Sequence, residues 1–311
     1  ISKRAREENL DVVHFHWLAP YIHGKHLPKT LFKTFSTAMK LLILKSHNCK
    51  TVWTVHNIES HDEENPRIEK IFKQLCTKLL FDKIITHCSS AKKEVKQNYR
   101  ATENQVKVIE HGNYIDSYPN KIGKAEAREK LGLDTDRTVF LCFGQIRRYK
   151  GIPELVEQFK KIESEKAALI IAGSDRDTEL TSEIKKKASE DSRIEVHDCF
   201  VPKEEVQTYM NASDCIVLPY RKITTSGTLV LAMSFDKPVL APSKGCIPEY
   251  VNKKDSILFE STHKLTEAIQ RYLKEEIKEE VGGNLAKIRE INWDEIAEKT
   301  GKLYIDLLKS N

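Results

Sequence analysis

The sequence predicts an α/β protein built from two Rossmann-like domains that face each other across a cleft. Short apolar runs alternate with amphipathic helical patterns along the chain, which is typical of parallel sheets with helices on both faces. This alternation stops once, at a polar stretch with Pro and Gly around residues 119–124, and then starts again. With 311 residues, the chain is long enough for two such cores.

In the first half of the chain, the apolar runs predict four strands, and the periodic segments predict helices between them. The expected strands are 11–16, 51–56, 83–87 and 106–110. The expected helices are the end of a charged helix at 2–9 and the segments 27–45, 67–80 and 90–98.

The helix 27–45 carries an apolar stripe flanked by lysines. The apolar residues at helical spacing are Leu31, Phe32, Phe35, Ala38, Met39 and Leu42. A stripe of this kind faces either the core, with the lysines outside, or a membrane surface. We favour the core.

In the second half, six strands are predicted, again with helices between them. The expected strands are 138–143, 168–172, 194–197, 215–218, 238–241 and 256–259. One or two final helices are expected within residues 285–311.

Composition favours a globular protein with one basic half. The chain is 40% hydrophobic and 31% charged, no apolar run approaches the ~20 residues of a membrane span, and no signal peptide is visible, so we expect a cytoplasmic protein. Residues 1–120 contain 19 Lys and Arg against 13 Asp and Glu, whereas the remainder contains 32 against 33. The basic half indicates an anionic partner, either a membrane surface or a nucleic acid. The alternative is a weakly basic domain without such a partner, which is common. Nucleic acid is not expected, because aromatic and basic residues are not interleaved as such sites require.

Ligands of parallel α/β sheets bind at the carboxyl ends of the strands. There the sequence places five groups of polar residues: His56 and Asn57, His111 and Gly112, Gly144 to Lys150, Gly173, and Thr224 to Thr228.

The most informative of these groups is the basic turn that contains Arg147, Arg148 and Lys150. A buried strand ends at Gly144, and a helical pattern follows the turn. Backbone N–H groups and the helix dipole then favour an anion such as a diphosphate. The alternative is an ordinary turn with solvated basic residues.

No metal site is predicted. His14 and His16 are expected to face opposite sides of their strand and to be structural. Asp175-Arg-Asp177 could imitate an Asp-x-Asp metal motif, but a solvated loop is expected there.

The order of short motifs along the chain points to one family. The motifs are Asp11-Val-Val-His-Phe-His16, Thr54-Val-His-Asn57, His111-Gly-Asn113, the loop from Phe143-Gly144 to Lys150-Gly151, Ala172-Gly173, Asp214 to Pro219, Lys237-Pro-Val239 and Gly245-Cys-Ile-Pro-Glu249. Together they resemble the retaining GT-B glycosyltransferases of family 4, over essentially the whole chain.

The resemblance implies a glycosyltransferase that moves a hexose from a nucleotide-sugar to a glycan or lipid-linked acceptor in polysaccharide or glycoconjugate synthesis. A donor of the GDP-mannose or UDP-glucose type is expected, with no cofactor and no metal, since fixed cations would stabilise the leaving diphosphate. The implied domains are an acceptor-side domain at 1–120, a donor-binding domain at 121–290 and a C-terminal helix at 291–311 that packs back toward the first domain. A lipid-linked acceptor fits a peripheral position on the inner face of a membrane.

The motifs also assign roles to residues. The expected catalytic residues are His56, Arg147 and Lys150. The expected donor-binding residues are Gly144, Gln145, Gly173, Thr225, Ser226, Gly227, Thr228 and Glu249, and the expected acceptor-side residues are His16, Asn57 and His111. Structural roles compete at His56, which could bond to backbone at its strand end, and at Glu249, which could cap the following helix.

The chain departs from the family pattern in three places. Gln145 replaces the motif arginine, and Arg147 is expected to supply the lost charge. The family's Glu-x7-Glu signature falls on Ile223 and Leu231, so hydroxyls and amides of residues 224–228 are expected to hold the diphosphate instead. The family's first strand and glycine-rich loop are missing, so the first domain is expected to be incomplete. These departures leave open a nucleotide-sugar-binding pseudoenzyme without transfer activity.

Overall fold

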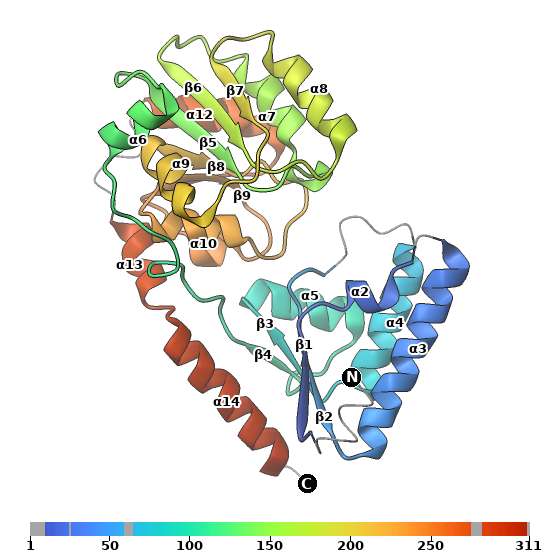
Figure 1. The fold of residues 1–311 in the computed structure, drawn as a ribbon. Coiled ribbons are helices and arrows are strands. Elements are labelled where there is room, and N and C mark those ends of the chain that lie inside the picture. Colours follow the sequence, from blue (N-terminus) through green and yellow to red (C-terminus); the bar gives the residue numbers. More distant parts are fainter. Residues whose placement is uncertain (1–9, 25, 59–64, 275–281, 310–311) are drawn as a thin grey trace. The chain divides into compact units, whose positions relative to one another are not determined.

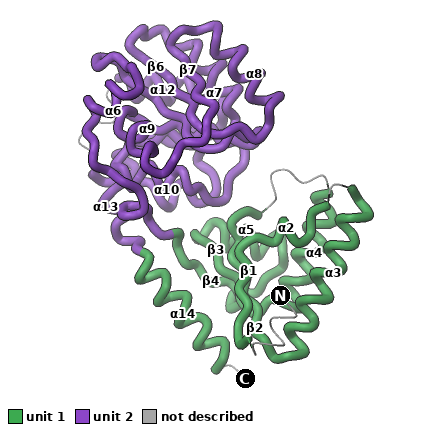
Figure 2. Tube along the Cα trace, in the orientation of Figure 1, with its two compact units in different colours: residues 1–111, 293–311 green, residues 112–292 purple. Residues whose placement is uncertain are grey.

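The computed structural model describes residues 10–24, 26–58, 65–274 and 282–309, and the expected helix at 2–9 lies outside them. The chain divides into two compact units, residues 1–111 with 293–311 and residues 112–292 (Figure 2). The expected domain boundary after residue 120 falls inside the second unit. Residues 293–311 are grouped with the first unit although they end the chain.

The first unit contains a parallel four-stranded sheet, and its strands confirm the four that the sequence predicts. In sheet order they are β1 (Val12–Phe15), β2 (Lys50–Thr54), β3 (Lys83–Thr86) and β4 (Val106–Val108). Since every strand runs in the same direction, the four carboxyl ends lie along one edge of the sheet.

Helices cover both faces of this sheet (Figure 1). They are α2 (Ala19–Ile22), α3 (Leu27–Ser46), α4 (Pro66–Leu79), α5 (Ser89–Tyr99) and α14 (Trp293–Lys309). Trp53 and Ile84 pack in one core with residues of α3, α4 and α5. Their neighbours Val52 and Ile85 point to the opposite face and pack against Leu303 and Leu307 of α14, as expected from the alternation of side chains along a strand.

The orientation of α3 differs from the one predicted from the sequence. The residues that α3 buries are Thr30, Thr37, Leu41 and Leu44, whereas Leu31, Phe32, Phe35, Met39 and Leu42 are exposed. Two threonines can face inward because their hydroxyls meet backbone groups beside α2: Oγ1 of Thr37 donates to the carbonyl of Tyr21 (2.8 Å), and the amide of Gly24 donates to Oγ1 of Thr30 (3.1 Å). The expectation that the apolar stripe faces the core is therefore wrong.

The second unit contains a parallel six-stranded sheet, which confirms the six predicted strands. In sheet order they are β10 (Ser256–Phe259), β9 (Val239–Pro242), β8 (Cys215–Val217), β5 (Thr138–Phe143), β6 (Ala167–Ala172) and β7 (Ile194–His197). The two longest strands, β5 and β6, are almost entirely buried.

Helices also lie on both faces of this sheet (Figure 1). One set is α7 (Ile152–Phe159), α8 (Thr178–Ala188) and α12 (Leu265–Leu273), and the other is α6 (Lys124–Leu131), α9 (Val206–Ala212), α10 (Gly227–Ser234) and α13 (Gly283–Arg289). The short helices α11 (Ile247–Tyr250) and η1 (Arg148–Lys150) follow strand ends. Within the described residues of both units, no helix has the length and apolar character needed to cross a membrane.

Candidate functional site

In the second unit, two glycines let the ends of β5 and β6 approach each other closely. The amide of Gly144 donates to the carbonyl of Ala172 (2.8 Å), and Gly144 has a φ of +94°. A Cβ on Gly173 would lie 2.2 Å from the carbonyl oxygen of Gly144. Only glycine fits at residue 173, because any side chain would collide with the passing backbone.

Lys150 brings a buried positive charge to this turn. Its side chain is 5% exposed, and Nζ donates to the carbonyl of Phe143 (3.2 Å). A Cβ built on Gly144 would lie 3.0 Å from Nζ and 3.5 Å from Oγ1 of Thr228, so these groups surround one small space. Burial lowers the pKa of Lys150, and the nearby charge of Arg147 lowers it further. An anion beside Nζ would offset both effects.

The other residues of the basic turn have separate positions. Arg148 is turned toward α8, with its guanidinium 2.7 Å from Asp177 and 3.1 Å from Glu179. Arg147 is half-buried, and Gln145 is exposed. Arg147 is thus the cation that accompanies Lys150, whereas Arg148 serves the packing of the loop on α8.

The N-terminus of α10 forms the second part of the site. Oγ of Ser226 accepts a hydrogen bond from the amide of Leu229 (3.1 Å) and lies 2.9 Å from the hydroxyl of the buried Tyr220. Ser226 is therefore the N-cap. The amides of Gly227 and Thr228 are in the first turn, where N–H groups have no partner within the helix and attract anions.

Glu249 and the Asp175–Asp177 segment were also singled out by the sequence. The N-cap of α11 is Cys246, and within the described residues no side chain caps this helix, so the capping role considered for Glu249 is wrong. Asp177 is the N-cap of α8, where it accepts from the amide of Leu180 (3.1 Å). Asp175 accepts from Thr181 (2.9 Å), so both aspartates stabilise the start of α8.

In the first unit, four histidines follow the four parallel strands and form a row along the carboxyl edge. They are His16 after β1, His56 after β2, His87 after β3 and His111 after β4. Neighbouring ring centroids are 5.6 Å apart for His16 and His56, 5.1 Å for His56 and His87, and 5.6 Å for His87 and His111. We call this set the histidine row.

Hydrogen bonding fixes the direction of the row. Nδ1 of His87 lies 2.9 Å from the carbonyl of Ile109, and since a carbonyl only accepts, Nδ1 carries the proton. In the neutral ring, Nε2 of His87 is then an acceptor for Nδ1 of His56 at 3.4 Å. Nε2 of His56 in turn lies 3.3 Å from Nδ1 of His16, so His16, His56 and His87 can donate in sequence toward Ile109.

The two central histidines of the row, His56 and His87, are neutral at neutral pH. The pKa of His56 is lowered to about 3, first by burial and then by His87 and His16. Burial is also the main cause that lowers the pKa of His87 to about 4. His56 therefore presents an uncharged ring, in which Nδ1 donates to His87 and Nε2 accepts the 3.3 Å contact from His16.

Two tryptophans contact the histidine row. The indole of Trp17 stacks on His56 with centroids 4.3 Å apart and an interplanar angle of 14°. Trp293, at the start of α14, meets His111 edge-on at 5.8 Å. Both tryptophans are about half exposed. Exposed indole faces of this kind suit the apolar side of a sugar ring.

His14 corrects a second expectation. Its ring stacks on that of His16 at a centroid distance of 4.4 Å, because residues two apart in an extended segment share a face. His14 also joins two elements, with Nδ1 2.6 Å from the hydroxyl of Tyr304 and Nε2 2.7 Å from Oγ1 of Thr54. Burial, followed by the charge of His16, lowers its pKa to about 4.

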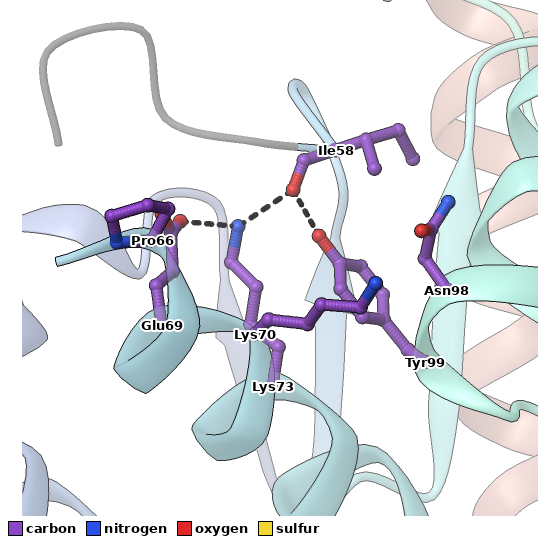
Figure 3. Close-up of a pocket in the computed structure, with 7 residues that line it drawn as sticks. All are labelled: Ile58, Pro66, Glu69, Lys70, Lys73, Asn98 and Tyr99. Carbon is purple, nitrogen blue, oxygen red and sulfur yellow. Dashed lines mark hydrogen bonds and ion pairs between the residues drawn. The ribbon is translucent and has the colours of Figure 1, made fainter.

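A buried ion pair holds the chain just after His56 and Asn57 (Figure 3). Nζ of Lys73 donates to the carbonyl of Ile58 (2.9 Å) and lies 2.6 Å from the carboxylate of Glu69. The hydroxyl of Tyr99 donates to the same carbonyl. These contacts restrain the backbone that leaves β2 and thereby help to position His56.

The site residues predicted from the sequence do not include His87, Trp17, Trp293 or Tyr220. His87 follows its strand as His56 does, so the rule that singled out His56 could have found it. Tyr220 follows Pro219 with no motif of its own. Among the described residues, no group of three or more His, Cys, Asp or Glu side chains is arranged to hold a metal ion.

Both units match known glycosyltransferase families. Residues 1–114 match "Glycosyltransferase Family 4", and residues 137–275 match "Glycosyl transferases group 1". The chain belongs to family 4 of the GT-B glycosyltransferases. The first match spans the histidine row of this glycosyltransferase, and the second spans Lys150 and the start of α10.

Relatives and solved structures agree with this assignment. The glycosyltransferase is 24% identical to a GDP-mannose:glycolipid 4-beta-D-mannosyltransferase of Xanthomonas campestris. The alignment spans 303 residues and covers 96% of this chain and 80% of the relative. Its fold is similar to that of sucrose-phosphate synthase from Thermosynechococcus elongatus (TM-score 0.76, 18% identity, 99% of this chain and 76% of that one). It is also similar to Anabaena Alr3699/HepE, solved in complex with UDP (TM-score 0.76, 16% identity, 98% and 80%).

Proposed function

We propose that this hexosyltransferase uses a nucleotide-sugar of the GDP-mannose or UDP-glucose type and glycosylates a glycan or a lipid-linked acceptor. The observation that carries the proposal is the buried ammonium of Lys150 beside the glycine turn and the start of α10. The Xanthomonas relative is named for GDP-mannose and a glycolipid, and Anabaena Alr3699/HepE was solved with UDP and with UDP-glucose. These names support the two donor types and the lipid-linked acceptor.

On the donor side, the diphosphate binds Lys150, Arg147 and the amides of Gly227 and Thr228. Charge-assisted hydrogen bonds to phosphate are among the strongest available, and they stabilise the leaving nucleoside diphosphate as the glycosidic bond breaks. The glycines at 144 and 173 leave room for the phosphate next to the backbone. Gln145, Thr225 and Glu249 contribute contacts to the sugar and the nucleotide of the donor. Fixed cations take this role, so transfer proceeds without added divalent metal.

On the acceptor side, the histidine row and Asn57 bind the incoming hydroxyl. Nε2 of neutral His56 accepts a hydrogen bond from it in place of the 3.3 Å contact with His16. His16 lies beside His56, and His111 lies beside His87 along the same edge. With a lipid-linked acceptor, the enzyme works as a peripheral protein on the cytoplasmic face of a membrane.

A donor panel tests the proposal. Calorimetric titration with GDP-mannose, UDP-glucose and ADP-glucose should give saturable binding for a GDP- or UDP-sugar. Release of the nucleoside diphosphate should be slow without acceptor, faster with a detergent-solubilised lipid-linked saccharide, and unchanged by EDTA. Tight donor binding with neither hydrolysis nor transfer would instead indicate a nucleotide-sugar-binding pseudoenzyme.

A further inference from the structure

Helices α3 and α4 expose two apolar rows on the first unit. On α3, Phe32 is 72% exposed and Phe35 is 67% exposed, and on α4, Leu79 is 65% exposed. The other large apolar side chains exposed on these helices are Leu27, Leu31, Met39 and Leu42 on α3, and Ile71 and Leu75 on α4. The two helices pack side by side (Figure 1). We call these nine residues the α3–α4 face.

Isolated exposed apolar residues are ordinary, but rows of them along two adjacent helices are not. A monomeric globular protein rarely leaves such a large apolar surface in water, and larger patches mark a surface that binds something. The core of this unit is already complete beneath the helices, where Leu41, Leu44, Phe72 and Cys76 are buried. The exposed rows are therefore additional to what the fold requires.

The exposed charges on α3 and α4 themselves have one sign. Helix α3 contains no Asp or Glu, and the single acid of α4, Glu69, is buried and paired with Lys73. The exposed charged residues of the two helices are Lys29, Lys40, Arg67, Lys70 and Lys78. Apolar rows accompanied on their own helices by exposed cations are the pattern of helices that lie in the interface of an anionic bilayer.

A second copy of the chain fits the face less well. A symmetric dimer would place the same surface on both sides, so lysines would meet lysines. Lysine is also depleted in protein interfaces, whereas anionic headgroups would complement it.

We infer that the α3–α4 face inserts its apolar side chains into the headgroup region of an anionic lipid bilayer. Phe32, Phe35 and Leu79 enter the acyl boundary, and the surrounding lysines and Arg67 contact the lipid phosphates. The inference deepens the proposed function, on which it rests for its biological role, because a lipid-linked acceptor is presented at such a surface.

Vesicle co-sedimentation of the full chain tests the inference. At low salt the protein should sediment with phosphatidylglycerol vesicles and stay in solution with phosphatidylcholine vesicles, and added salt should release it. The double substitution Phe32→Ser and Phe35→Ser should weaken binding about tenfold or more, because two exposed rings no longer enter the bilayer. Lys40→Gln with Lys78→Gln should also weaken it about tenfold.

Matched controls separate the face from a general effect of composition. Phe200→Ser removes a phenylalanine that is 78% exposed in the second unit, and Lys186→Gln removes an exposed lysine of α8. Neither should change vesicle binding, and unfolding temperatures should show that all variants are folded.

Three results would overturn the inference: equal binding to both lipids, no binding at low salt, or unchanged binding by the phenylalanine double variant. A dimer that this variant dissociates, seen by sedimentation equilibrium without lipid, would assign the face to a second copy. Hydrolysis of the donor in solution should survive in the same variant. If wild-type protein binds vesicles but neither hydrolyses the donor nor transfers the sugar, the proposed function is wrong, whereas the inference that the α3–α4 face binds lipid remains valid.

Discussion

Lys150 is an unusual residue because it is buried and no ion pair with a carboxylate is found for it among the described residues. Burial of an ammonium is costly unless an opposite charge or good hydrogen bonds compensate it. Burial and the charge of Arg147 lower its pKa, the thiol of Cys142 raises it, and none of these causes is a carboxylate. At the scale of single residues, this is the position where the protein gains most from binding an anion.

Lys150→Ala should weaken nucleotide-sugar binding about tenfold to a hundredfold, since a charge-assisted contact to phosphate contributes roughly 1.5–3 kcal/mol. Calorimetric titration with the preferred donor measures the change. Lys186→Ala, an exposed lysine of the same unit, is the control and should bind like wild type. Unchanged donor affinity in folded Lys150→Ala would refute the assignment.

The histidine row makes the first unit sensitive to acid. In the unfolded chain a histidine titrates near pH 6.5, whereas the folded pKa of His87 is about 4. Between these values the unfolded state binds a proton that the folded state does not, so stability falls as pH falls. For His87 alone, the loss at pH 5 is about 2 kcal/mol.

We therefore expect the unfolding free energy of the protein to decrease between pH 7 and pH 5, with part of the decrease assigned to His87. His87→Asn retains a side-chain donor for the carbonyl of Ile109 but does not titrate, so its stability should depend less steeply on pH. Denaturant unfolding at both pH values gives the two slopes. Identical slopes for wild type and His87→Asn would show that His87 is not protonated on unfolding.

At the scale of elements, α10 shows how a helix start can serve packing and binding together. Leu229, Val230 and Met233 are buried and anchor the helix in the second unit. Ser226 caps it, which directs the remaining first-turn amides outward. A Cβ on Gly227 would meet only the hydroxyl of Tyr114, at 3.5 Å within the described structure, so the fold itself tolerates a side chain there.

Gly227→Val should abolish donor binding and change stability little, because the isopropyl group would occupy the place proposed for a phosphate oxygen. Donor titration and thermal unfolding of the same sample measure the two effects. Thr228→Val is a useful companion, since it removes the hydroxyl but keeps the amide, and it should bind donor more weakly than wild type yet measurably. Normal affinity of Gly227→Val would mean that the nucleotide is held elsewhere.

At the scale of the whole molecule, the first unit is discontinuous in sequence. Its last element, α14, follows the entire second unit along the chain but packs on the sheet formed by residues 12–108. Tyr304 of this helix meets His14, and Trp293 meets His111, so α14 also contacts the carboxyl edge of the sheet. A segment that follows the second unit in the sequence therefore covers one face of the sheet in the first unit.

Leu307→Ala should lower the unfolding free energy by about 2–3 kcal/mol, because it leaves a cavity between α14 and the face of the sheet with Val52 and Ile85. Leu308→Ala, at a 40% exposed position on the same helix, should change it by about 0.5 kcal/mol or less. Denaturant unfolding compares the two. Equal losses would show that α14 does not pack on the sheet through Leu307.

The sequence by itself determined the ten strands, the main helices, the glycine turn before Lys150 and the family. These features depend on local periodicity and on short motifs, which are written in neighbouring residues. The tertiary structure alone decided that the apolar stripe of α3 faces outward, since periodicity locates a stripe but not what covers it. It also decided that His87 and Trp293 join His16, His56 and His111, and that Tyr220 supports Ser226. Residues from separate strands become neighbours only through the order of the strands in the sheet and the return of α14, which no local pattern contains.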